Sequence, residues 1–304
     1  MNLKSILNGK LIVTPIFVLL SLSFSALVHA EEVTQKFNGL TLNANLELAD
    51  GKDFNDGMVL IVHGYLTHNK MELIRTAQEA LLDNDRSSLA INLSLGIDNR
   101  HGFYDCTLPQ RHLQDDALKE IAVWVEWLRS RGVSQIVIMA HSRGANQVMV
   151  YAVEQKDPEV THLLMLAPGS GENIKNLYQA RYGKSLDQTL AIAQRKIEAG
   201  KGTELIQDID LLSCPKAQAT AETFISYYST NKFRQFNSFL PRISIPTLII
   251  VGTLDEYRGD LVNQVKPYID GNRVQLKVIQ NADHFFRDFN MEEAIEASIE
   301  FIHQ

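Results

Sequence analysis

The 304-residue sequence has few of the features that identify a class of protein at first sight. It has only two cysteines and two tryptophans, and it contains no lysine or arginine run, no internal repeat and no low-complexity segment. Its formal net charge is −7, and an acidic chain without a basic run argues against nucleic acid as a partner. His68, His101 and His112 lack the spacing of zinc ligands, so no metal is indicated. We therefore expect neither a metal nor any other cofactor.

Long apolar runs are absent except near the N-terminus. Residues 11–28 are almost wholly apolar, two lysines precede them, and Val28-His29-Ala30 fits the small-x-small cleavage rule. This pattern predicts a signal peptide over residues 1–30 and a periplasmic or secreted chain over 31–304. The alternative is an uncleaved anchor, because about 18 apolar residues could nearly span a bilayer. We expect cleavage, and no stable membrane insertion after it.

The two cysteines, Cys106 and Cys214, are an even number in a chain expected to be exported. An oxidising compartment favours a disulfide between them, and two unpaired thiols are the alternative. Such a bridge would close a loop on the order of 100 residues, which the chain-entropy model values at about 4 to 5 kcal/mol.

Short apolar runs alternate with helical patterns along the rest of the chain, as in βαβ units with a mainly parallel sheet. Continuous apolar runs suit strands that are covered on both faces. The expected buried strands are Met58–Val62, Leu89–Leu95, Ile136–Ala140, Leu163–Ala167, Thr247–Val251 and Val274–Ile279. Residues 33–48 alternate more and predict an antiparallel edge hairpin around Asn38-Gly39.

Helical patterns fill the gaps between these strands. Asn69 and Glu72 resemble a capping box that opens a helix over 70–82, and the last helix is expected over 291–302. About 70 residues separate two sheet strands after Gly169, far more than a usual connection of a few to a dozen residues. Their composition is helical and mixed, so we interpret 170–241 as a helical cap over the strand ends, where ligands of open α/β sheets bind.

The run from Gln135 to Asn146 carries the strongest functional signal. Apolar residues end abruptly at Ser142, with the small Ala140 two residues before it and Gly144 two residues after it. A helical stretch follows. This is the pattern of a nucleophile elbow, a strained strand-turn-helix that presents the serine hydroxyl at the tip of a sheet. Ala140 departs from the commoner glycine but is the next smallest residue.

A serine nucleophile needs a base, and the base needs an orienting acid. Asp255 follows one apolar strand and His284 follows the next, in the order Ser, Asp, His that accompanies an elbow serine. Glu256 is the competing acid, but Asp255 stands at the usual offset from its strand. We expect all three groups to lie at one edge of the sheet.

The chain resembles the α/β-hydrolase superfamily over residues 33–302. The segments that carry the resemblance are Val62-His-Gly-Tyr65, Ala140-His-Ser-Arg-Gly144, Gly252-Thr-Leu-Asp255 and Ala282-Asp-His284. Each is weak alone, whereas all four in order after expected strands are specific. The resemblance implies an α/β fold, a mainly parallel sheet flanked by helices with a helical cap insertion, similar to exported bacterial esterase-like members.

The resemblance also implies roles for individual residues. Ser142 would be the nucleophile, His284 the general base and then acid, and Asp255 the orienting acid. The backbone N–H groups of Tyr65 and Arg143 would form the oxyanion hole.

Arg143 is unusual, because the residue after the elbow serine is commonly apolar. Its guanidinium could recognise an acidic group of the substrate, or it could pair with a nearby carboxylate of the protein.

The sequence thus predicts a serine hydrolase that cleaves a small-molecule carboxylic ester through an acyl-enzyme intermediate. The alternatives are an amidase, peptidase or thioesterase that uses the same three residues, and a non-catalytic binding member of the fold. Fold does not specify substrate, and the sequence leaves the oligomeric state open.

Overall fold

A computed structural model describes residues 30–170, 174–229, 232–257 and 259–304. The expected signal peptide, apart from Ala30, lies outside these residues. Within the described part of the chain, an eight-stranded sheet has the order β1-β2-β4-β3-β5-β6-β9-β10. β1 and β2 form an antiparallel hairpin, β2 pairs antiparallel with β4, and the remaining pairs are parallel. The strands are β1 Glu31–Phe37, β2 Leu40–Glu47, β3 Met58–Val62, β4 Ser88–Asn92, β5 Ile136–His141, β6 Val160–Leu166, β9 Thr247–Gly252 and β10 Val274–Ile279.

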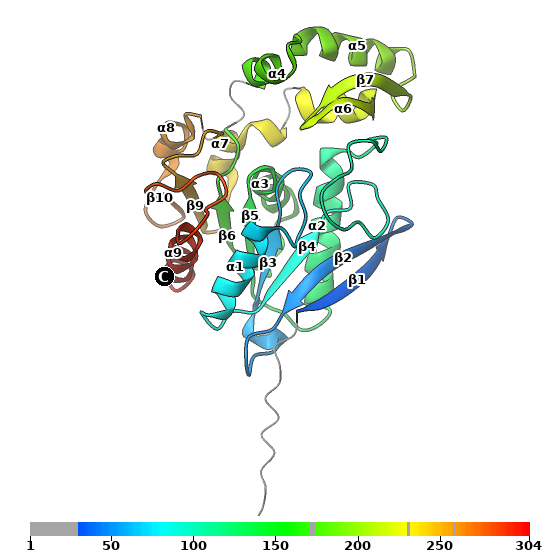
Figure 1. Cartoon of the computed structure of the whole chain (residues 1–304). Helices are drawn as coiled ribbons and strands as arrows, with labels where there is room; N and C mark the ends of the chain where they lie inside the picture. The colour runs from blue at the N-terminus through cyan, green and yellow to red at the C-terminus, as the bar shows by residue number, and fades with distance from the viewer. Residues whose placement is uncertain (1–29, 171–173, 230–231, 258) are drawn as a thin grey trace, which may run out of the picture.

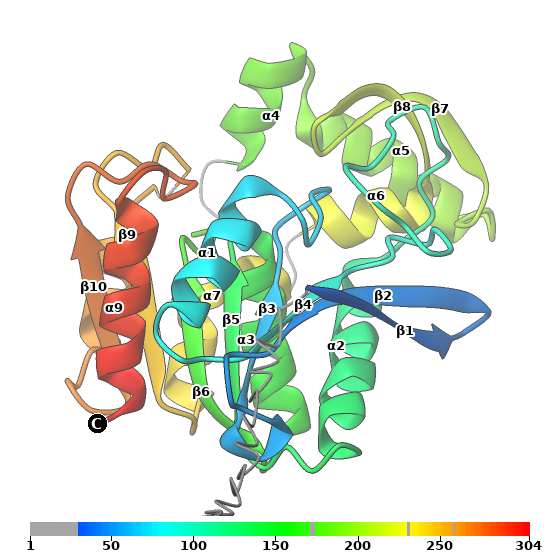
Figure 2. The ribbon, with the colours of Figure 1, turned by 60° about the horizontal axis from the view of Figure 1, so that its bottom comes forward.

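Helices cover both faces of this sheet (Figures 1 and 2). Side chains of a strand point alternately to opposite faces, so Leu60 and Val62 pack with α2 and α3, whereas Val59 and Ile61 pack with α1 and α9. This double cover explains why β3 is apolar at every position and why β5 is apolar up to its last residue, and it confirms the predicted fold class. The helices around the sheet are α1 Glu72–Leu82, α2 Gln114–Arg129, α3 Arg143–Gln155, α7 Phe236–Phe239, α8 Leu261–Val265 and α9 Asn290–Ile302.

The start of α1 corrects one sequence-based prediction. The helix begins at Glu72 with Met71 as its N-cap, and no side chain caps it. Asn69 instead donates a hydrogen bond from its side chain to the carbonyl oxygen of Ala90 in β4, at 3.0 Å. The expected capping box is therefore wrong, because this buried asparagine binds the neighbouring strand rather than its own helix.

The long connection between β6 and β9 forms a separate layer with its own apolar core. It contains the helices α4 Ile174–Tyr182, α5 Leu186–Glu198 and α6 Ala221–Tyr228. It also contains an antiparallel hairpin of β7 Leu205–Leu211 and β8 Cys214–Thr220, which the prediction of a helical cap did not include. The burial of β7 does not alternate: Gln207 and Asp208 are exposed, and the three residues that follow, Ile209 to Leu211, are all buried.

This layer, called the cap below, covers one end of the sheet (Figure 1). The covered end is the one at which β5 runs into α3, so the cap lies above the elbow serine. No helix in the described ranges is both long and apolar enough to span a bilayer.

Candidate active site

Ser142 lies in the sharp turn between β5 and α3. Its φ of 53° and ψ of −123° form a backbone conformation that costs a non-glycine residue energy and is found where structure imposes it. Two residues later, Gly144 is required because the chain passes very close to the loop after β3. A Cβ on Gly144 would lie 2.4 Å from the carbonyl oxygen of His63. The elbow therefore requires glycine at 144 so that α3 can approach the loop after β3.

Ser142, His284 and Asp255 are brought together by three different loops at the same edge of the sheet. The His284 Nε2 lies 3.0 Å from the Ser142 Oγ. The His284 Nδ1 lies 2.9 Å from the Asp255 Oδ2. This is the serine–base–acid chain of hydrogen bonds that activates a serine hydroxyl.

The acid of this chain is Asp255 rather than its neighbour Glu256. The Asp255 side chain is 1% exposed, and that of Glu256 is exposed to solvent. The second oxygen of Asp255, Oδ1, accepts a hydrogen bond from the Tyr257 backbone N–H at 2.8 Å. Both carboxylate oxygens are thus committed, which fixes the side chain that orients the His284 imidazole.

The loop after β3, residues 63–67, packs directly against the elbow. A Cβ built on Gly64 would lie 3.3 Å from the Ser142 Cβ, so Gly64, the residue before Tyr65, packs against the serine. Arg143 is the first residue of α3, and the first N–H groups of a helix have no acceptor within the helix. The oxyanion hole predicted from the N–H groups of Tyr65 and Arg143 thus involves one residue that follows Gly64 and one that follows Ser142.

A buried arginine, which sequence reasoning missed, holds this loop. Arg100 donates to the carbonyl oxygen of Thr67 at 2.8 Å and to that of Leu93 at 2.8 Å. Glu120 lies in the same buried network and accepts from the Ser94 hydroxyl at 2.5 Å; burial raises the pKa of Glu120 to about 6. No local pattern could have identified Arg100, because its burial arises only when distant loops pack together.

Two further histidines support the site without touching the serine hydroxyl. His63 accepts at Nε2 from the Leu93 N–H at 3.0 Å, and His141 donates from Nε2 to the carbonyl oxygen of His284 at 2.8 Å. Burial lowers the pKa of each to about 3. Both rings are therefore neutral near neutral pH, and His141 positions the backbone of His284.

The side chain of Arg143 lies between α2 and the cap helix α6. Its guanidinium donates to the Gln114 Oε1 at 2.8 Å and lies 5.2 Å and 5.3 Å from the ring centroids of Tyr65 and Tyr227. No carboxylate within the described ranges forms an ion pair with it. The paired carboxylate that the sequence left open as an alternative is thus not seen among these residues.

The cap is fastened to the loop before α2. Cys106 and Cys214 form a disulfide with a Cα–Cα distance of 5.3 Å, and Cys214 begins β8 of the cap. Gln110 extends this contact by donating its N–H to the Gln218 carbonyl oxygen at 2.8 Å. His112 follows with a 2.8 Å hydrogen bond between Nδ1 and the Tyr227 hydroxyl.

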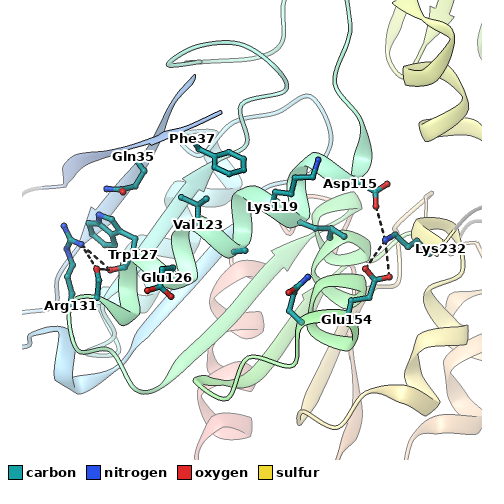
Figure 3. Close-up of a pocket in the computed structure, with 14 residues that line it drawn as sticks. Gln35, Phe37, Asp115, Lys119, Val123, Glu126, Trp127, Arg131, Glu154 and Lys232 are labelled. Atoms are coloured by element: carbon teal, nitrogen blue, oxygen red, sulfur yellow. Dashed lines mark hydrogen bonds and ion pairs between the residues drawn. The ribbon is translucent and has the colours of Figure 1, made fainter. Parts of the chain in front are cut away.

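A surface groove lies away from the serine. This groove of about 750 Å³ runs along α2 and is lined by residues of β1, α2 and α3 together with Lys232, none of them a predicted site residue (Figure 3). Lys232 closes one end through ion pairs with Asp115 and Glu154 at 2.9 and 3.0 Å. In the part of the chain that the structure describes, no group of three or more His, Cys, Asp and Glu side chains could hold a metal ion.

Comparisons with known proteins agree with this architecture. A family model described as a protein of unknown function (DUF1749) matches residues 111–239, less than half of the chain. The chain is 25% identical over 202 residues to a putative esterase/lipase 3 of Mycoplasma pneumoniae, which covers 66% of this chain and 68% of that protein.

Solved structures are similar over nearly the whole chain. Est1E from Butyrivibrio proteoclasticus with bound ferulic acid has a TM-score of 0.66 at 20% identity, covering 90% of this chain and 100% of that one. The α/β hydrolase GrgF from Penicillium sp. sh18 has a TM-score of 0.64 at 13% identity, covering 90% and 98%. At such identities the likeness concerns the fold alone, and it agrees with the α/β fold that the resemblance implied.

Proposed function

We propose that this chain, a member of the α/β-hydrolase superfamily, is an exported serine hydrolase that cleaves a small-molecule carboxylic ester through an acyl-enzyme intermediate. The observation that carries the proposal is the continuous chain of hydrogen bonds from Ser142 through His284 to Asp255. The similarity to a putative esterase/lipase supports an ester as the substrate.

In the first half of the reaction, the Ser142 Oγ attacks the ester carbonyl carbon while its proton passes to the His284 Nε2. Asp255 accepts the Nδ1–H of the same ring and stabilises the imidazolium that forms. The tetrahedral intermediate collapses when His284 returns the proton to the leaving alkoxide. An alcohol departs and the acyl group stays on Ser142.

The second half repeats these steps with water. His284 takes a proton from the water as its oxygen attacks the acyl carbon, and it then protonates the Ser142 Oγ as the acid leaves. In both halves the carbonyl oxygen carries a negative charge that the N–H groups of Tyr65 and Arg143 stabilise. One such donor is typically worth about 3 to 4 kcal/mol in the transition state.

Export is supported by two independent features. The sequence of residues 1–30 has the pattern of a signal peptide, and the Cys106–Cys214 disulfide suits an oxidising compartment. We propose that the mature enzyme is periplasmic or secreted and acts on small molecules rather than on nucleic acid.

The proposal is tested by assaying the mature chain on matched esters, amides and thioesters of short acyl groups. Ser142→Ala should lower kcat for every substrate that is turned over by at least about 1,000-fold. Ser130→Ala is the matched control, because Ser130 ends α2 far from the cap and is exposed. Circular dichroism and Tm of both variants report whether the fold is kept.

Each outcome has a distinct meaning. Turnover of esters that depends on Ser142 supports the proposal, and a marked preference for amides or thioesters would replace the substrate class while keeping the three residues. Wild-type protein that is folded yet inactive on the whole panel would favour a non-catalytic binding member and contradict the proposal.

A further inference from the structure

Two arginines and a tyrosine form a row beside the elbow serine. Arg143 follows Ser142 and lies against one side of Tyr65, with its Cζ 5.2 Å from the ring centroid. Arg181, at the end of α4 in the cap, approaches the Tyr65 hydroxyl with its Nη1 at 3.5 Å. Both positive charges act on the phenol and oppose the effect of burial, which raises the pKa of Tyr65.

The charges of this row are not neutralised by the described part of the protein. Arg143 contacts the neutral Gln114, and Arg181 donates to the carbonyl oxygen of Leu212 at 3.2 Å. The Nε of Arg143 is buried and has no hydrogen-bond partner among the described residues. A buried donor without an acceptor costs free energy, so such an atom in a site requires an explanation.

Two cations that join elements elsewhere in the chain do have carboxylate partners. Arg129 lies within 2.8 Å of carboxylate oxygens of both Asp157 and Glu159. Lys232 pairs with Asp115 and Glu154. These two surface cations join elements through carboxylates, and the buried Arg100 is held by several carbonyl oxygens, whereas Arg143 and Arg181 have no carboxylate partner among the described residues and the Arg143 Nε has no partner at all among them.

We infer that Arg143 and Arg181 bind an anionic group of the substrate, so that the preferred esters carry a carboxylate, sulfonate or phosphate near the scissile bond. This inference rests on the proposed function. A bound anion would neutralise the row and supply an acceptor to the buried Arg143 Nε and to the exposed Arg181 guanidinium, and the planar geometry of both groups matches an oxyanion. Arg181 would bring the cap into contact with the substrate.

The test compares pairs of esters in which one member carries an anionic group that the other lacks; intrinsic differences in reactivity cancel when the ratio is compared between wild type and variants. One pair places the charge on the acyl group: the 4-nitrophenyl monoester of glutaric acid against 4-nitrophenyl valerate. The other places it on the leaving group: the acetate of 4-hydroxybenzenesulfonate against phenyl acetate. The measured quantity is the ratio of kcat/KM for the anionic ester to kcat/KM for the neutral one.

Arg181→Gln should lower this ratio about 10- to 100-fold for at least one pair, the loss expected for a charge-assisted hydrogen bond. Arg181→Lys, which keeps the charge, should restore part of it. Raising the salt concentration should lower the ratio in the wild type and have less effect in Arg181→Gln, because salt screens a charge contact. Arg195→Gln is the control, since Arg195 is exposed on α5.

Labelling of Ser142 by a fluorophosphonate, measured on the same preparations, separates the two possible failures. Labelled, active protein whose ratio is the same in wild type and Arg181→Gln for both pairs would overturn the inference and leave the proposed function standing. Folded wild-type protein that is neither labelled nor active would overturn the proposed function itself.

Discussion

At the scale of single residues, the site depends on side chains whose hydrogen bonds leave them one orientation. The two oxygens of Asp255 accept from His284 and from the Tyr257 backbone. The backbone of His284 is in turn held by His141. In the proposed mechanism, an imidazole fixed in this way needs little rearrangement before it accepts the Ser142 proton.

Replacing the buried acid should separate catalysis from stability. Asp255→Asn keeps the shape of the side chain but removes the charge and presents the wrong partner to His284 Nδ1. We expect kcat for ester hydrolysis to fall by about 1,000- to 10,000-fold. The adjacent Glu256→Gln, at an exposed position, should change kcat less than about threefold. Equal losses in the two variants would remove Asp255 from its assigned role.

The elbow should tolerate no side chain at 144. A Cβ there lies 2.4 Å from the His63 carbonyl oxygen, and both groups belong to backbone that cannot yield cheaply. Gly144→Ala should lower the free energy of unfolding by about 2 kcal/mol or more, in the upper range of overpacking. Gly169→Ala is the control, because a Cβ at position 169 would come no closer than 3.5 Å to its nearest neighbour, the Asn146 Oδ1. Urea denaturation of both variants checks this; a Gly144→Ala protein as stable as Gly169→Ala would contradict the close approach.

At the scale of elements, the position of the cap depends on its attachment to the segment before α2. The disulfide, the backbone hydrogen bond of Gln110 and the contact between His112 and Tyr227 lie within seven residues of sequence, 106–112. Tyr227 also contacts Arg143. The attachment of the cap therefore connects, through Tyr227, to Arg143, the residue after Ser142.

Removing the disulfide should cost stability more than it costs catalysis. The two cysteines are 108 residues apart in sequence, so the loop term is worth about 5 kcal/mol, less any strain in the folded state. A Cys106→Ala/Cys214→Ala double variant should lose a large part of this free energy of unfolding by chemical denaturation. Reducing agent should destabilise the wild type similarly and leave the double variant unaffected; an equal response of both proteins would show that the reagent acts elsewhere.

The elements that the sequence predicted well are those with a simple burial pattern. Met58–Val62 and Val274–Ile279 were predicted with the bounds that the structure has. The first is a wholly apolar run, and in the second apolar residues recur around Gln275 and Lys277. The β7–β8 hairpin was missed because its strands are interrupted by exposed polar residues and because the surrounding composition is helical.

The residues of the site likewise fall into those that the sequence predicted and those that it did not. Ser142, Asp255 and His284 follow predicted strands, and a motif at the end of a strand fixes where a residue lies in a parallel sheet. Arg100 and Arg181 gave no signal, since the first acquires its partners from loop packing and the second from the fold of the cap. Residues whose role depends on contacts between distant segments could not be found from spacing alone.

At the scale of the whole molecule, buried histidines should make folding sensitive to acid. Burial lowers the pKa of His63 and His141 to about 3 and that of His112 to about 4. Unfolding returns these rings to a pKa near 6.5. Between these values the unfolded chain binds more protons, so the three histidines make the folded state less stable as pH falls below about 6.5.

Glu120 acts in the opposite direction, because its pKa is raised to about 6 and the folded state binds its proton first. Together these groups let the unfolded state bind about two more protons than the folded state. The free energy of unfolding should therefore fall by about 2 to 3 kcal/mol per pH unit between pH 6 and pH 5. Urea denaturation at a series of pH values measures this slope. His112→Gln should reduce the proton difference between the two states by about one and make this slope shallower, whereas His303→Gln, at an exposed position, should not. A free energy of unfolding that is constant or rises on acidification would refute the assignment of neutral buried rings.

The central claim is that Ser142 carries the acyl group during turnover, and trapping that intermediate tests it most directly. The mature chain is mixed with an excess of an activated ester, quenched in acid within the first turnover, and examined by intact-protein and peptide mass spectrometry. We predict one added acyl mass per chain, located on the peptide that contains Ser142 and absent from Ser142→Ala. An active enzyme that carries no acyl group when quenched in the first turnover, or carries it at another residue, would contradict this account.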